Sequence, residues 1–150
     1  MEAAPVDAPP RVRGLASWLL NRAAAPANRL VARALEGSGI RRSHYSLLAV
    51  LDEHGPTSQA GLSRRTGLDR SDVVAAVNHL AAAGLLQRAP DADDRRRNVV
   101  TLTARGRDRL LELDEVLRAV QDEVLAPLSG TERRQLTDLL ARIVDHHGAG

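Results

Sequence analysis

The segment from Thr57 to Gly84 constrains the fold more than any other part of the chain. A short helix capped by Thr57 or Ser58 can extend to about Thr66, and Gly67 is then suited to the left-handed turn that follows a helix. A second helix begins directly after this turn, and Gly84 ends it. Two short helices joined by a glycine-containing turn are typical of a helix-turn-helix.

The second helix has one apolar face and one face that we expect to meet solvent. Asp69 is placed to cap it, and Asp72 in its first turn favours the helix N-terminus. Its apolar residues are Val73, Val77 and Leu80, flanked by Val74 and Ala81. The opposite face carries the residues that a recognition helix would present to DNA bases, namely Arg70, Ser71, Ala75, Asn78 and His79. The alternative is an ordinary solvated helix face.

Two short β-compatible segments, residues 85–88 and 98–103, come after the helix pair. The loop between them holds three aspartates, at positions 91, 93 and 94, and then Arg95, Arg96 and Arg97. This pattern predicts a hairpin with a long charged tip, which beside a helix-turn-helix would be a wing. Arginine suits a narrow minor groove, and an aspartate two positions earlier can hold it in a fixed pose. The alternative is a solvated charge cluster on a mobile loop.

The distribution of charge also separates this region from the C-terminal part of the chain. All 21 basic residues are arginine. Residues 64–107 contain nine Arg and five Asp, a balance of +4, whereas residues 108–150 contain five Arg and nine acidic residues, a balance of −4. A basic middle region indicates a surface that binds a polyanion. The acidic C-terminal region suggests a separate part that is solvated or dimerises.

The remaining segments predict helices on both sides of the helix-turn-helix. Apolar residues are almost all Leu, Ala and Val, with only Trp18 and Tyr45 aromatic, so we expect a mainly α fold with a small β-hairpin wing. Pro26 predicts either a kink or two helices within residues 11–36. We divide the chain into a flexible tail at 1–10, N-terminal dimerisation and effector helices at 11–46, a winged helix-turn-helix at 47–103 and C-terminal dimerisation helices at 104–150.

The run from Gly55 to Gly106 resembles the winged helix-turn-helix of the MarR family of bacterial transcription regulators. The resemblance rests on the "LDRS" entry to the second helix, the "AGLLQR" exit and the "DDRR" wing followed by "LTARG". It extends from about Leu47 to Leu113. Gly61 and Ser63 depart from the family pattern, which we expect to weaken the first helix, and Arg97 adds a charge to the wing.

The resemblance implies the roles of several residues. Asp94 and Arg96 match the wing Asp-x-Arg, with Arg96 as the minor-groove finger, and Arg70 and Ser71 match the recognition-helix contacts. We also include Ser58 and Gln59, at the start of the first helix, among the DNA contacts.

The resemblance further implies a homodimer that binds a roughly palindromic operator in double-stranded DNA, as a repressor. The apolar stripes of residues 104–126 and 131–144 agree, because they exceed what a small winged helix can cover. A small anionic or aromatic effector would bind near Trp18, Arg22, His44 and Tyr45. The alternative is that these aromatic residues belong to a core or an interface.

Other functional classes find little support in the sequence. The chain has no cysteine, and its five histidines lack metal-ligand spacing, so we expect neither a metal nor another cofactor. We find no phosphate loop, nucleophile elbow or dinucleotide fingerprint, and therefore do not expect an enzyme. The apolar runs are too short to span a bilayer and no signal peptide is evident, which predicts a cytoplasmic protein. A winged-helix protein-interaction module and a metal-responsive regulator remain as alternatives.

Overall fold

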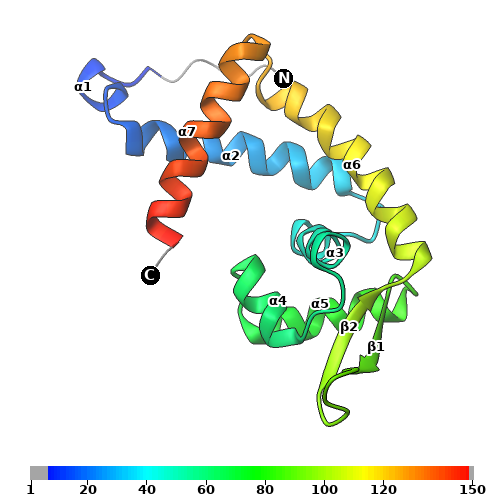
Figure 1. Ribbon diagram of the computed structural model, residues 1–150. Coiled ribbons are helices and arrows are strands. Elements are labelled where there is room, and N and C mark those ends of the chain that lie inside the picture. The colour runs from blue at the N-terminus through cyan, green and yellow to red at the C-terminus, as the bar shows by residue number, and fades with distance from the viewer. Residues whose placement is uncertain (1–6, 149–150) are drawn as a thin grey trace. The chain divides into compact units, whose positions relative to one another are not determined.

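A computed structural model describes residues 7–148 (Figure 1). It is mainly helical with one antiparallel hairpin, as the sequence predicts. Its elements are α1 (Pro10–Arg13), α2 (Ala16–Leu35), α3 (Arg42–His54), α4 (Gln59–Thr66), α5 (Arg70–Ala82), β1 (Leu86–Pro90), β2 (Asn98–Leu102), α6 (Ala104–Val124) and α7 (Gly130–Gly148). The chain forms two compact units: a central unit, Val31–Arg118, and an outer unit, made of the residues up to Leu30 and those from Ala119 onward.

The core of the central unit lies between α3, α4, α5, the hairpin and the first part of α6. Its most deeply buried side chains, each less than 2% exposed, are Leu47, Leu48, Leu62, Val73, Val77, Leu80, Val100 and Leu113. Helix α5 buries Val73, Val77 and Leu80 as expected, and Ala76 completes this face. Val74, expected at its flank, is instead 43% exposed.

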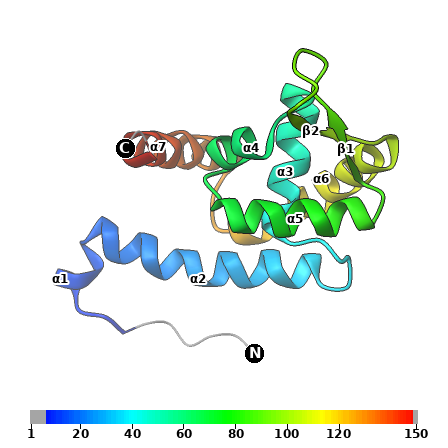
Figure 2. The same ribbon diagram turned by 90° about the horizontal axis from the view of Figure 1, so that it is seen from below.

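The helix-turn-helix forms where the sequence predicts it (Figure 2). Ser58, rather than Thr57, caps α4, since its hydroxyl accepts a hydrogen bond from the Gly61 amide at 3.0 Å. Gly67 has a φ of 74°, the left-handed conformation that glycine adopts without strain. Asp69 occupies the cap position of α5, but its side chain makes no capping hydrogen bond.

Gly61 and Ser63 both lie within α4, which forms over Gln59–Thr66, and each makes a close local contact. A Cβ atom at Gly61 would lie 2.8 Å from Cγ2 of Thr57, so the close approach of these segments requires glycine. The Ser63 hydroxyl donates a hydrogen bond to the Leu68 carbonyl at 2.6 Å and thereby closes the turn. Both departures from the family pattern are therefore accommodated locally.

The hairpin pairs β1 with β2 in antiparallel register, with Arg88 opposite Val100. Thr57 adds a bridge to Val100 through two backbone hydrogen bonds of 3.1 and 2.8 Å, which joins the hairpin to the segment before α4. The Thr103 hydroxyl caps α6 by accepting a hydrogen bond from the Gly106 amide at 3.0 Å. Strand β2 is thus joined through Val100 to the segment before α4, and it leads directly into α6.

In the outer unit, α2 continues through Pro26 without dividing, and the break in the chain lies instead between α1 and α2. Residues 1–6 of the expected flexible tail lie outside the described residues, and Pro10 already begins α1. Ser129 and Glu132 form a capping box at the start of α7. Leu139 and Ile143, from the apolar stripe of residues 131–144, are 54% and 46% exposed in the single chain, and α7 buries none of its described residues.

Candidate nucleic-acid interface

The exposed face of α5 forms a stripe along the helix. Arg70, Val74 and Asn78 succeed one another at four-residue spacing, and Ser71 and Ala75 lie beside them; all five are exposed. Side chains three or four residues apart share one face of a helix. The face is therefore opposite the buried side of Val73, Ala76, Val77 and Leu80, and its first turn carries Arg70 and Ser71, as the sequence predicts.

Two polar residues near the C-terminal end of α5 contact neighbouring elements. The Arg88 guanidinium in β1 donates a hydrogen bond to the Asn78 side-chain oxygen. Arginine only donates, so the Asn78 amide oxygen faces the guanidinium and its NH₂ group is directed elsewhere. His79 differs from the other predicted contacts, because its ring stacks on His44 and its Nε2 lies 2.7 Å from the Gly39 carbonyl oxygen.

The wing tip is a turned loop with its charges outward. The Asp91 amide donates to the Arg97 carbonyl at 2.7 Å, and the Arg97 amide donates to the Asp94 carbonyl at 3.0 Å. The predicted aspartate–arginine pair is present: Asp94 Oδ1 accepts from the Arg96 backbone amide at 3.1 Å and lies 3.4 Å from Nε. The Arg96 side chain is 93% exposed, so its guanidinium is oriented yet open to a ligand.

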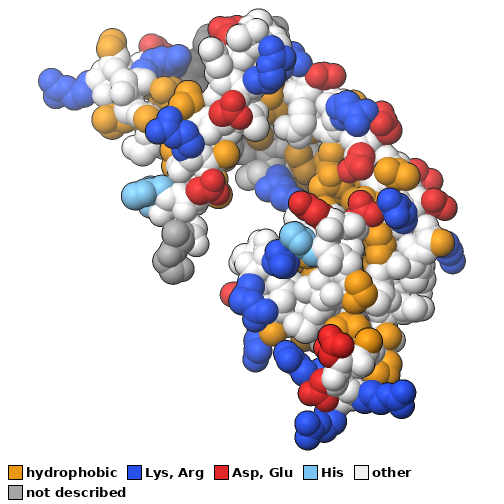
Figure 3. Space-filling model, viewed as in Figure 1, with side chains coloured by type: hydrophobic (Ala, Val, Ile, Leu, Met, Phe, Trp, Pro, Cys, Tyr) orange, Lys and Arg blue, Asp and Glu red, His pale blue; other side chains and the backbone are white. Residues whose placement is uncertain are grey.

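Basic side chains of the central unit gather around this tip, with acidic side chains among them (Figure 3). Arg95, Arg96 and Arg97 are all exposed. Because the hairpin and α5 belong to the same compact unit, one part of the chain presents both an exposed helix face and an exposed arginine cluster. Such a combination suits the grooves and the phosphates of a duplex.

The two predicted contacts in α4 are more enclosed than those of α5. Ser58 is half-buried, and its hydroxyl already caps the helix. Gln59 Oε1 is buried and has no hydrogen-bond partner. Among the described residues, no other buried side-chain oxygen or nitrogen lacks one. Ser58 thus has a structural role in the free protein, and Gln59 has an acceptor that is not used.

The four expected effector residues fall into two pairs in different units. In the outer unit, the Arg22 guanidinium carbon lies 5.7 Å from the centre of the Trp18 ring. In the central unit, Tyr45 donates a hydrogen bond to Asp114 at 2.7 Å. The Asp114 hydrogen bond, together with burial and the carboxylate charge, raises the pKa of Tyr45 to about 12.

His44 is almost fully buried, with 8% of its surface exposed. Its Nδ1 accepts a hydrogen bond from the Arg41 amide at 3.0 Å. Burial lowers the pKa of His44, and the nearby charges of His79 and Arg41 lower it further. His44 and Tyr45 therefore both stabilise the unit itself.

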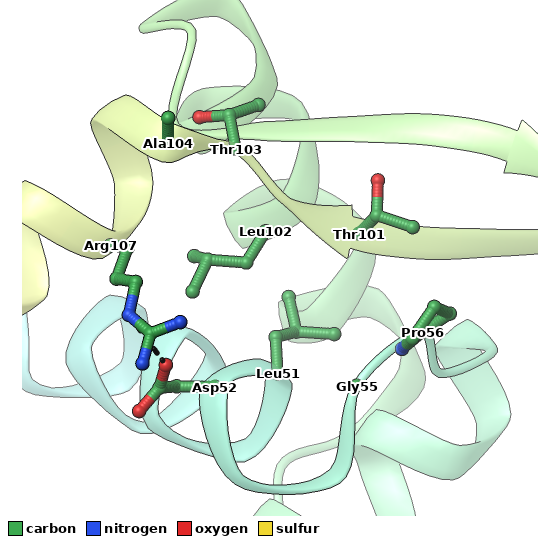
Figure 4. A pocket seen from close by; sticks show the side chains of 9 residues that line it. All are labelled: Leu51, Asp52, Gly55, Pro56, Thr101, Leu102, Thr103, Ala104 and Arg107. Carbon is green, nitrogen blue, oxygen red and sulfur yellow. Dashed lines mark ion pairs between the residues drawn. The ribbon is translucent and has the colours of Figure 1, made fainter.

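A shallow pocket of about 440 Å³ lies where α3 ends beside β2 and the start of α6 (Figure 4). Leu51 and Leu102 are apolar side chains in its lining. Asp52 and Arg107 form an ion pair at its edge, with 3.6 Å between Oδ1 and Nε. The sequence did not predict this pair, because residues 55 positions apart give no local signal. The pocket holds none of the predicted DNA contacts.

The described residues show neither a metal centre nor a membrane span. Within 7–148, no group of three or more His, Asp or Glu side chains could hold a metal ion. In that same range, no helix is long and apolar enough to cross a bilayer.

The fold and this interface define a winged helix-turn-helix protein. The sequence model of the MarR family matches residues 38–97. The repressor NicR of Pseudomonas putida is 33% identical over 101 residues, which are 67% of this chain and 64% of NicR, so the match spans less than two thirds of that relative. The chain belongs to the MarR family, a family of transcription regulators.

Solved structures extend the likeness to most of the chain. A probable transcriptional regulator from Pseudomonas aeruginosa is 34% identical, with a TM-score of 0.79 over 89% of this chain and 99% of that one. BpsR of Bordetella bronchiseptica, whose DNA binding is regulated by 6-hydroxynicotinic acid, is 25% identical, with a TM-score of 0.80 over 92% of this chain and 99% of BpsR. Both matches include the helices outside the winged helix-turn-helix.

Proposed function

We propose that this protein is a sequence-specific DNA-binding repressor that binds a palindromic operator as a homodimer. One observation carries the proposal: the exposed stripe of α5 and the exposed wing arginines belong to one compact unit. In this arrangement α5 enters the major groove, where Arg70 and Ser71 meet base edges and Asn78 lies further along the helix. The wing reaches the neighbouring minor groove with Arg96, and Arg95 and Arg97 meet phosphates.

Exposed apolar side chains on α2, α6 and α7 support the homodimer. Apart from Val74, the large hydrophobic residues that stay exposed in the single chain are Leu15 just before α2, Leu19, Leu20, Leu111, Val116, Leu139, Ile143 and Val144. Leu139 and Ile143, four residues apart, share one face of α7, and an exposed apolar helix face of this kind marks an interaction surface. A two-fold dimer that buries these helices would present two copies of α5 to successive major grooves.

We also propose that a small aromatic anion regulates DNA binding. The support is the likeness to BpsR, whose DNA binding is regulated by 6-hydroxynicotinic acid, together with the Trp18–Arg22 pair. An arginine beside an aromatic ring suits a flat carboxylate, which it can contact through charge and stacking.

The proposal is tested by fluorescence anisotropy with DNA from upstream of the protein's own gene, against a shuffled duplex and at several salt concentrations. We expect preference for the upstream duplex and weaker binding as salt rises, because phosphate contacts release counterions. Arg70→Ala should cost about 1–3 kcal/mol on the specific duplex and relax preference at one base pair. If no duplex selected from genomic DNA binds better than a shuffled one, the protein is not a sequence-specific regulator, and an interaction module gains support.

A further inference from the structure

Val74 is an exposed apolar side chain at the centre of the α5 stripe. It is 43% exposed, while the core face of the same helix is complete without it. Valine is also a poorer helix former than alanine, the residue at the next position. Neither core packing nor helix propensity therefore accounts for a valine at this position, and its side chain is open to contact with a ligand.

The neighbours of Val74 restrict what that ligand can be. Arg70 precedes it by one turn and Asn78 lies one turn after it, so both ends of the stripe are polar. The exposed arginines of the wing belong to the same unit. The surface as a whole thus suits a polyanion, and only its centre is apolar, where Val74 and Ala75 lie side by side.

A DNA major groove offers one apolar group on its base edges, the C5-methyl of thymine. A valine side chain in the middle of a recognition helix can pack against this methyl, while polar neighbours bond the bases on either side. Ala75 has a single methyl and reaches less far from the helix axis. The larger side chain is therefore the better placed of the two to make the contact.

We infer that Val74 determines operator specificity by packing against a thymine methyl in each half-site, between the bases that Arg70 and Asn78 contact. The inference rests on the proposed function and adds to it a requirement on the operator sequence. It also assigns a role to a residue that hydrophobic periodicity alone places at the edge of the protein core.

The test replaces each thymine of an operator duplex, one at a time, by deoxyuridine, which removes only the methyl. The duplex is one selected from genomic DNA by the wild-type protein. We expect one symmetry-related position at which the loss of the methyl weakens binding about four-fold, the worth of one buried methyl group. Val74→Ala should weaken binding to the thymine duplex by a similar factor and be insensitive to deoxyuridine at that position.

Two variants serve as controls. Val74→Thr keeps one γ-methyl and the branched shape, and should retain most of the dependence on the thymine methyl. Glu53→Ala removes an exposed side chain of α3, outside the α5 stripe, the wing and the proposed dimer surface, and should retain it in full. Circular dichroism checks that Val74→Ala is folded. We expect it to be, because alanine favours the helical conformation.

The outcomes separate this inference from the function on which it rests. If Val74→Ala keeps the wild-type response to deoxyuridine at every position, Val74 does not read a thymine methyl, while a preference for the operator over a shuffled duplex still supports the regulator. If the wild-type protein selects no duplex over random DNA, the proposed function fails and the inference fails with it.

Discussion

The imidazole rings of His44 and His79 stack with their centroids 4.6 Å apart and their planes 12° from parallel. His79 also lies 2.7 Å from the Gly39 carbonyl through Nε2, so that Nε2 carries the proton and donates. His44 accepts the Arg41 amide through Nδ1, which must therefore be unprotonated. The two rings connect the end of α5 to the start of α3 and to the loop before it.

This contact makes the stability of the protein depend on pH. The pKa of His44 in the folded protein lies below its ordinary value of about 6.5. The unfolded chain therefore binds the proton more readily, and stability falls as the pH decreases below about 6.5, until the pH passes the lowered pKa. Urea unfolding at pH 8.0, 7.0, 6.0 and 5.0 should show a falling midpoint.

His44→Asn keeps an acceptor for the Arg41 amide and should reduce this pH dependence. The control is His146→Gln on α7, an exposed histidine outside the contact, which should leave the dependence unchanged. An equally steep fall in the midpoint for His44→Asn would show that other groups cause the pH effect.

The hydrogen bond from Tyr45 to Asp114 joins two helices across 69 positions of sequence. Tyr45→Phe removes the donor but keeps the ring, and should destabilise the protein by about 1–2 kcal/mol, since the acceptor is charged. Chemical denaturation measures this loss. Asp114→Asn keeps an acceptor and should cost less than Tyr45→Phe; an equal or larger cost would indicate that the carboxylate acts through other partners.

The same hydrogen bond gives a spectroscopic prediction. Tyr45 is the chain's only tyrosine, so the phenolate absorbance reports on this residue alone. With a pKa of about 12, raised from the ordinary value of about 10, the phenol stays protonated in the folded protein well above pH 10, and this contribution to stability is lost progressively as the pH rises from about 10 through about 12. Asp114→Asn should shift the phenolate transition to lower pH, whereas an unchanged transition would contradict the assigned cause.

Gly106 allows α6 to begin directly against β1. A Cβ atom at this position would lie 2.1 Å from the Leu85 carbonyl oxygen, a distance that requires the backbone to move. Gly106→Ala should therefore destabilise the protein by about 1–3 kcal/mol, the usual cost of overpacking, or by more if the wing detaches. Gly130→Ala is the matched control, because the nearest atom to its Cβ, in the flexible Arg134 side chain, lies 3.8 Å away. Similar thermal midpoints for the two variants would refute this packing argument.

Much of the central unit was predictable from sequence, because its signals are local. Gly67 marks the turn between α4 and α5, and the apolar residues of α5 recur at helical spacing. Val74, expected at the flank of the apolar face, is exposed because at 100° per residue it lies about 100° from Val73, whereas Ala76 lies only about 60° from Val73. The smaller residue is accordingly the buried one.

Contacts between distant segments could not be predicted in this way. The His44–His79 stack, the Tyr45–Asp114 hydrogen bond and the Asp52–Arg107 ion pair each join separate elements. No periodicity or turn signal specifies which helices meet, so these pairs appear only once the fold is known. By contrast, the Asp94–Arg96 pair lies within one loop, and its two-residue spacing was sufficient to predict it.

That wing pair leads to the last prediction, which concerns DNA affinity. Arg96→Ala should weaken binding by about 1–3 kcal/mol, because it removes a groove contact. Asp94→Ala leaves the guanidinium in place but frees it to rotate, and should weaken binding less. In the Arg96→Ala background, Asp94→Ala should then have no further weakening effect, since it acts by orienting Arg96. Anisotropy titrations of the wild type, the two single variants and the double variant form a double-mutant cycle. Additive losses of affinity would mean that Asp94 affects binding through some other group.

The salt dependence of the same titrations distinguishes the neighbouring arginines. Arg95→Ala and Arg97→Ala should each weaken binding to specific and shuffled duplexes alike and reduce the salt slope by about one, because each phosphate contact releases about one counterion. Arg142→Ala removes an exposed arginine of α7 and should leave the slope unchanged. A slope unaltered by the two wing substitutions would exclude both residues as phosphate contacts and leave Arg96 as the sole contribution of the wing arginines.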